Sequence, residues 1–444
     1  MLLPRMRNTS PTAAGPRSLV RRAAIAAAAL LVAGPMAASA HAEPAAPNLP
    51  AELIAAITRD LKISPADYLQ RSELAQQVAA FSTTAQRQYP DLFAGAWLDE
   101  AGKAIVALAD GPGIDAARKA VQDAGYTVKD VAKSESTLRS EKNAFLKWME
   151  GQPAEVSGQI RGVAIDTVNN TLAVRADQIG LQLPGFANSA RVIVMAAPPV
   201  AGETVDIPKA DAIASTGTGA IAAGDAYASV AGRMSLRCSM GFNGLDHDNY
   251  VVNITAGHCN PNIAATNGGE NSPGVFELVN DKVGQQLGRF EKSVLGNQDY
   301  SIVRVFDTTG DRFENNLVRV PNAAPIGITG VAIPVVGAPV CKSGSRTGFS
   351  CGTVNAVDQT VQVGDRLLTQ SFSANICALP GDSGGPIVTG TLALGISSAS
   401  SVADYPICEI PNLIGLLTGN QPQLFAQPVS VVLSDNPGLR LFGK

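Results

Sequence analysis

The sequence predicts a chain of two parts, an α+β domain followed by an all-β domain. Residues 43–220 alternate helix-like and hairpin-like stretches and contain no cysteine. From about residue 221 onward, short strand-like segments follow one another with frequent Gly, Asn and Pro turns, the pattern of an all-β sandwich or barrel. The length of 444 residues agrees with this division, because it exceeds that of one ordinary domain.

The individual elements follow from the periodicity of apolar residues and from the turn residues between them. We expect a linker at residues 195–224, which are rich in Ala, Pro and Gly. The expected helices are 50–61, 65–89, 113–125 and 136–151; the expected hairpins are 94–110, turning at Glu100–Gly102, and 162–177, turning at Asn169–Asn170; the clearest strand-like stretches are 299–306, 340–354, 366–374 and 385–398.

Residues 1–42 have the composition of an export signal. An arginine-rich start is followed by the apolar run "AAIAAAALLVAG" and by the small-residue cleavage sites Ala38–Ala40 and Ala40–Ala42. The run of about a dozen residues is shorter than the ~20 that a membrane-spanning helix needs. We therefore expect a secreted protein without a membrane anchor, exported by the general or the twin-arginine route. The arginines are Arg5, Arg7, Arg17, Arg21 and Arg22.

The composition limits the classes of partner and cofactor that the protein is expected to bind. A net charge of −4 favours neither a nucleic acid nor an anionic membrane, and no motif indicates a cofactor or a metal. An even number of cysteines in an exported protein indicates disulfides, whereas a zinc site would require closely paired cysteines that do not occur. The six cysteines are Cys238, Cys259, Cys341, Cys351, Cys377 and Cys408.

The stretch "CALPGDSGGPIV", residues 377–388, places one serine among three glycines. It fits both the nucleophile elbow of α/β-hydrolases and the serine loop of chymotrypsin-like proteases. A serine nucleophile needs a histidine base and a carboxylate that orients the base. No histidine follows Ser383, so the α/β-hydrolase order Ser, acid, His is excluded and the order His, acid, Ser remains.

Three histidines precede Ser383, and His258 is the best candidate for the base. His41 lies at the expected signal cleavage, His247 lies in a polar turn, and His258 follows an apolar strand-like run. Asp299 is the preferred acid because it opens the alternating strand "DYSIVRV". The other candidates for the acid are Asp281, Asp307, Asp311, Asp358 and Asp365, together with the glutamates between the histidine and the serine.

The stretches "TAGHC", "DYSIV" and "CALPGDSGGP" resemble the chymotrypsin-like serine proteases, above all the bacterial branch of α-lytic protease and the streptogrisins. "GDAYASVAGRMSLRCSMGFN" is similar to the start of those mature enzymes, "VGAPVCKSGSRTGFSCGTV" to their second disulfide loop, and "LFAQPVSVVL" to their closing helix. The region 43–180 resembles their pro-region. The resemblance implies two six-stranded antiparallel β-barrels behind an α+β pro-domain.

The resemblance also implies the roles of the site residues. Ser383 would be the nucleophile, His258 the base and Asp299 the orienting acid, and the N–H groups of Gly381 and Ser383 would form the oxyanion hole. The implied disulfides are Cys238–Cys259, Cys341–Cys351 and Cys377–Cys408. Asp382 would form a buried ion pair with Lys342, where arginine is usual; a surface-exposed Lys342 is the alternative.

The implied substrate pocket carries no charged side chain. The position that holds an aspartate in trypsin-like enzymes is Cys377, so a preference for basic residues at P1 (the residue before the cleaved bond) is not expected. We expect a small or medium apolar P1 residue, and an acidic one stays open. The pocket residues would be Ala378, Leu379, Pro380, Ser398, Ala399 and Ser400.

The domains would then be a signal peptide at 1–42, a pro-domain with linker at 43–220 and a protease domain at 221–444. The pro-domain would act as an intramolecular folding chaperone and inhibitor and be removed, leaving a monomeric enzyme that acts on proteins or peptides. An independent binding domain that stays attached is the alternative for residues 43–220. For the whole chain, the alternative is a catalytically silent secreted binding protein on a protease fold.

Overall fold

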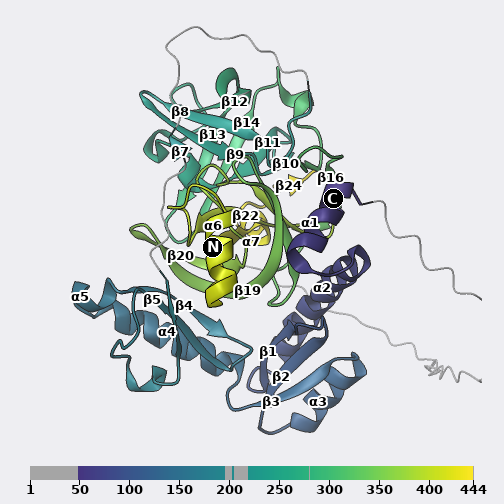
Figure 1. Cartoon of the computed structure of the whole chain (residues 1–444), viewed down its shortest axis with the longest axis vertical. Helices are drawn as coiled ribbons and strands as arrows, with labels where there is room; N and C mark the ends of the chain where they lie inside the picture. The colour runs from purple at the N-terminus through teal and green to yellow at the C-terminus, as the bar shows by residue number, and fades with distance from the viewer. Residues whose placement is uncertain (1–48, 196–202, 205–218, 280, 444) are drawn as a thin grey trace, which may run out of the picture. The chain divides into compact units, whose positions relative to one another are not determined.

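The second part of the chain is mostly β, as the sequence predicts, and its strands gather in two large sheets (Figure 1). The computed structural model describes residues 49–195, 203–204, 219–279 and 281–443. The expected signal segment and most of the expected linker therefore lie outside the described residues. The end of that linker is different from the prediction, because Ile221–Ala223 are buried.

The first large sheet has the strand order β24-β10-β11-β14-β13-β12-β8-β9-β7. All of these neighbours are antiparallel, and apolar side chains on their inner face, such as Val252, Ile254 and Phe290, are fully buried. Its strands are β7 Glu203–Thr204, β8 Ala226–Ala231, β9 Met234–Ser239, β10 Phe242–Leu245, β11 Val251–Thr255, β12 Gly274–Val279, β13 Lys282–Leu295, β14 Asp299–Val305 and β24 Arg440–Leu441. The short helices beside it are η3 Gly257–Cys259, η4 Ile263–Ala265 and η5 Gly310–Arg312, and a separate pair joins β15 Leu317–Val318 to β16 Ile326–Gly327.

The second large sheet contains a closed set of six strands, because β18 pairs with both β21 and β19. This closure matches the barrel that the resemblance implies. The edge of β19 continues into β4–β6 of the first part, and β17 joins β22 in parallel. The elements from the second part are β17 Gly330–Val331, β18 Pro339–Gly344, β19 Gly348–Val363, β20 Arg366–Ala374, β21 Pro386–Thr389, β22 Leu392–Ser400, β23 Leu424–Pro428, α6 Glu409–Thr418 and α7 Val429–Asp435.

The first part is α+β, and its helices and hairpins lie where the sequence places them. Helix α2 begins at Ser64, whose side chain accepts a hydrogen bond from the Asp67 N–H, and Pro65 occupies the first helical position. Helix α4 begins in the same way at Ser134. The elements are α1 Ala51–Ala56, η1 Ile57–Leu61, α2 Pro65–Gln88, β1 Phe93–Leu98, β2 Ala104–Ala109, α3 Ile114–Asp123, β3 Thr127–Val131, α4 Glu135–Glu150, α5 Ala154–Ser157, β4 Ile160–Asp166, β5 Thr171–Ala176, η2 Gly185–Ala187 and β6 Arg191–Val194.

Two features of the C-terminal region differ from the sequence-based expectation. Residues 424–433 were expected to form one helix, but β23 occupies their first half because it pairs with β20 and β22, and α7 begins only at Val429. Helix α6 was not predicted. Among the helices of the described residues, none is both long and apolar enough to cross a membrane.

The first part is attached to the second by backbone pairing and by buried polar contacts. In the β4–β19 pairing, Val163 lies opposite Thr360, and Gly162 lies where an added Cβ would approach the Thr360 carbonyl to 2.5 Å. The Gly390 N–H donates to the hydroxyl of Tyr68, a fully buried side chain of α2, at 3.0 Å. Burial raises the pKa of Tyr68, so the hydroxyl stays neutral.

We predict that Tyr68→Phe destabilises the full chain, because it leaves the buried Gly390 N–H without an acceptor, at a cost of about 1–3 kcal/mol. Thermal unfolding would be measured in a Ser383→Ala background, which prevents self-digestion. Tyr126→Phe is the matched control, since no hydrogen bond of the Tyr126 hydroxyl occurs among the described residues. Equal melting temperatures for the two variants would contradict a structural role for this bond.

Candidate active site

His258 and Asp299 meet because the ends of two paired strands meet. Strand β11 leads into η3, which carries His258, while Asp299 is the first residue of the neighbouring β14. The Asp299 carboxylate accepts two hydrogen bonds from His258, one from the backbone N–H at 2.9 Å and one from ring Nδ1 at 2.7 Å. Both side chains are 4% exposed, so solvent scarcely competes for these bonds.

Asp299 is held from two further directions. The Ser398 hydroxyl donates to Asp299 Oδ2. The backbone N–H of Asp299 donates to Gln427 Oε1 at 3.2 Å. Burial by itself would raise the pKa of Asp299, but the charge of His258 and the hydrogen bonds from His258 and Ser398 outweigh it and lower the pKa below its usual value. The carboxylate is therefore ionised and can orient the imidazole.

Ser383 lies in the turn that precedes β21, and 8% of its surface is exposed. Its carbonyl accepts from the Ser239 N–H at 2.8 Å, while the next residue, Gly384, donates to Ser397 O at 2.8 Å. The Ser383 hydroxyl makes no hydrogen bond to His258 or to any other described residue. Catalytic hydrogen bonds are often long before a substrate binds, so this geometry leaves both groups available.

The turn before Ser383 adopts a conformation that requires glycine. Gly381 has a φ of +102°, in the left-handed region that side chains disfavour. Within the described residues, neither the Gly381 N–H nor the Ser383 N–H donates to a protein acceptor. These two N–H groups, from residues two positions apart beside the serine hydroxyl, can bind a negatively charged oxygen.

A cavity of about 20 Å³ opens beside Ser383. All six residues expected to form the pocket line this cavity, together with Ser397 and Ala403, which the sequence did not predict. Ala403 lies three residues after Ser400, the last residue predicted for the pocket wall. A second small cavity beside His258 and Asp299 shares Ser398 with the first. The first cavity is lined by Ala378, Leu379, Pro380, Ser383, Ser397, Ser398, Ala399, Ser400 and Ala403.

The three disulfides have the pairing that the resemblance implies. Cys238–Cys259 joins the end of β9 to the residue after His258, Cys341–Cys351 links β18 to β19, and Cys377–Cys408 ties the serine turn to the start of α6. The described residues contain no free cysteine.

Lys342 and Asp382 are buried together rather than exposed. Both side chains are 1% exposed, and Lys342 Nζ lies 3.4 Å from Asp382 Oδ2. The carboxylate also accepts from the N–H groups of Arg346, Thr347 and Leu379 at 2.9–3.1 Å and from the Thr347 hydroxyl. The remaining candidates lie elsewhere: His247 is exposed and pairs with Asp248, and Asp299 alone among the six aspartates bonds His258 in the described residues.

Comparison with known proteins agrees with this geometry. The trypsin family model matches residues 235–419. Streptogrisin-C of Streptomyces griseus is 28% identical over 401 residues, which cover 86% of this chain and 79% of that protein. Serine protease 2 of Streptomyces fradiae is 35% identical over 186 residues, 41% of this chain and 95% of that protein. Glutamyl endopeptidase 2 of Streptomyces griseus is 34% identical over 168 residues, 37% of this chain and 79% of that protein.

The region matched by the trypsin family model contains His258, Asp299 and Ser383, and the alignment with serine protease 2 covers nearly the whole of that relative. The alignment with streptogrisin-C extends over most of the chain, including the α+β part. The chain therefore belongs to the trypsin family, and it is a chymotrypsin-like serine endopeptidase of the bacterial branch that includes the streptogrisins.

Proposed function

We propose that the protein hydrolyses peptide bonds through a triad of Ser383, His258 and Asp299. The observation that carries this proposal is the buried pair in which Asp299 holds His258 by two hydrogen bonds. A proton on Nδ1, donated to Asp299, leaves Nε2 as the free base. Nε2 takes the proton of the Ser383 hydroxyl as its oxygen attacks the scissile carbonyl.

The proton on His258 is then passed to the nitrogen of the leaving amine, which departs as the C–N bond breaks and an acyl-enzyme forms. In the second step, His258 takes a proton from water as the water oxygen bonds to the acyl carbon. The ester bond to Ser383 then breaks, the carboxylic acid product leaves, and the proton returns from His258 to the serine oxygen. The N–H groups of Gly381 and Ser383 stabilise the oxyanion in both steps. Each such donor contributes a factor of about 10²–10³ in rate.

Residues 43–220 are proposed to be the pro-domain of a secreted zymogen, a folding chaperone and inhibitor that is cut away. Strand pairing between β4 and β19 supports a role for this domain in assembling the second barrel. Met195, 6% exposed, belongs to an apolar cluster with Ala399 of the pocket wall, so the first part ends beside the candidate site. This position favours an inhibitor over an independent binding domain.

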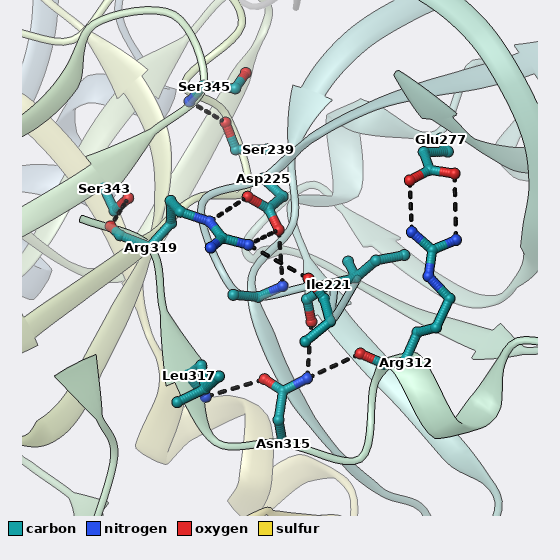
Figure 2. Close-up of polar contacts among 12 residues, drawn as sticks. Ile221, Asp225, Ser239, Glu277, Arg312, Asn315, Leu317, Arg319, Ser343 and Ser345 are labelled. Carbon is teal, nitrogen blue, oxygen red and sulfur yellow. Dashed lines mark hydrogen bonds and ion pairs between the residues drawn. The ribbon is translucent and has the colours of Figure 1, made fainter. Parts of the chain in front are cut away.

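The protease domain is proposed to begin near Ile221. The Ile221 carbonyl accepts from the side-chain amide of Asn243. It also accepts from the Asn315 amide, and Asp225 forms a two-bond ion pair with Arg319 at 2.7 Å (Figure 2). These contacts support Ile221–Asp225 as part of the protease rather than of the removed segment.

The test is labelling with a fluorophosphonate probe, combined with intact-mass and N-terminal analysis of the secreted protein. We predict that the wild type is labelled and begins near Ile221, whereas Ser383→Ala is neither labelled nor processed. Asp299→Asn should be labelled about 10⁴-fold more slowly, because the amide favours the wrong tautomer of His258. Asp311→Asn, on η5, is the matched control. A folded wild type that resists the probe would favour the silent binding protein.

We predict a preference for small apolar P1 residues. The cavity of about 20 Å³ holds little more than a water molecule or two, and no charged side chain lines it. Peptides with Ala or Val at P1 should be cleaved at least about tenfold faster than those with Phe, Lys or Glu. Ser400→Gly should widen the pocket and improve cleavage after Phe. Equal or faster cleavage after Glu would instead support the acidic preference that the name of one relative suggests.

The Lys342–Asp382 pair is proposed to shape the oxyanion turn, and its removal should be costly. We predict that Lys342→Met destabilises the chain by about 3–5 kcal/mol, because Asp382 would remain buried without its cation. Denaturant unfolding would be compared with that of Lys119→Met, which breaks an exposed pair with Asp123 and should change little. A Lys342→Met variant as stable as this control would contradict the assignment.

A further inference from the structure

We propose that the hydroxyl groups of Ser239 and Ser345 are positioning groups for the oxyanion turn. Both donate to the same acceptor, the carbonyl oxygen of Gly381, at 2.8 Å from Ser239 Oγ and 3.1 Å from Ser345 Oγ. A carbonyl oxygen has two lone pairs, so this pair of hydroxyls satisfies it fully. Neither serine belongs to the proposed triad or pocket, and the inference rests on the proposed function of the turn.

The need for such a restraint follows from the glycine itself. Gly381 must adopt a positive φ, and glycine is also the residue whose backbone rotates most freely. A rotation about its backbone bonds would carry its N–H away from the oxyanion. On one side of this N–H, the ring of Pro380 fixes the φ angle of that residue. On the other side, the peptide that follows is held at its N–H, which Asp382 donates to Leu379 O at 3.0 Å, and at its carbonyl by the two serine hydroxyls.

Ser239 couples three separate segments through one side chain. It is the last residue of β9 and is fully buried, and its N–H donates to Ser383 O at 2.8 Å. Its hydroxyl donates to Gly381 O and accepts from the Ser345 N–H at 2.9 Å, and the contact with Ser345 is visible in Figure 2. The hydroxyl therefore links β9, the turn between β18 and β19, and the serine turn. A rigid frame of this kind stabilises the turn before a substrate arrives.

The same segment that carries Ser345 also contacts the Lys342–Asp382 ion pair. Arg346 and Thr347 follow Ser345 and donate their N–H groups to Asp382 Oδ1 at 3.0 and 2.9 Å. The segment 345–347 thus contacts two successive residues of the turn, the carbonyl of Gly381 and the carboxylate of Asp382. Loss of the serine bonds would leave Asp382 anchored through its N–H and carboxylate but would remove both hydrogen bonds that orient the Gly381 carbonyl.

The experiment compares Ser239→Ala, Ser345→Ala and the double variant with wild type, all expressed as the full chain, with the mature start of each checked by N-terminal analysis. The readouts are kcat and KM for a peptide p-nitroanilide with Ala at P1, inhibition by the matching peptide boronic acid, and Tm. We expect the double variant to lose about 10–100-fold in kcat with KM changed less than about twofold, and to bind the boronic acid more weakly by a similar factor. Ser345→Thr should restore most of the activity, since it retains a hydroxyl.

Ser371→Ala is the matched control, because Ser371 is also buried and also donates to a backbone carbonyl, that of Gln359, outside the serine turn. It should lower Tm comparably and leave kcat unchanged. Unchanged kcat in the double variant, or an equal loss in Ser371→Ala, would overturn the positioning role. If the wild type is not labelled at Ser383, the proposed function fails and this inference with it; labelled wild type with unaffected variants overturns this inference alone.

Discussion

A buried carboxylate has to be paired, and the active site depends on how Asp299 meets that requirement. An ionised group without solvent is stable only where several donors replace water. The ring and backbone of His258 and the hydroxyl of Ser398 do so here, and they come from η3 and β22. Satisfying the carboxylate therefore also fixes the imidazole and the pocket wall against β14. The same hydrogen bonds therefore stabilise the fold and orient the base.

The serine turn follows the same logic with a second buried carboxylate. The Asp382 carboxylate accepts hydrogen bonds from N–H groups of the turn itself and of the β18–β19 connection, and Lys342 supplies the opposite charge. Glycine at 381 makes the turn possible but leaves it free to rotate. The contacts from Ser239 and Ser345 restrain that freedom. A conformation that a single residue type permits is thus restrained by polar groups from distant segments.

Residue inventory predicts the site better than it predicts its surroundings. Only three histidines and their order along the chain were needed to choose His258, and the strand at 299–305 indicated Asp299. The contacts of Ser239 with Gly381 span 142 positions, so no local pattern reveals them. Helix α6 had a visible signal in the spacing of its apolar residues, but several of them are exposed, and Leu416 and Leu417 are 75% and 77% exposed. The β4–β19 pairing joins the predicted hairpin 162–177 to Thr360 and Val361, which lie outside the predicted strand-like stretches, and no local periodicity specifies this partner.

The surface between the first part and the second barrel is less stabilising than its extent suggests. Arg175 of β5 is 2% exposed, and its Nε and Nη1 have no partner among the described residues. Burial, with the nearby charge of Arg191, lowers the pKa of Arg175 to about 10. The contacts with Ser373, Gln423 and the ring of Phe425 offset only part of the desolvation cost. The incompletely paired charge of Arg175 therefore offsets part of the stabilisation that strand pairing gives to the contact between the first part and the second barrel.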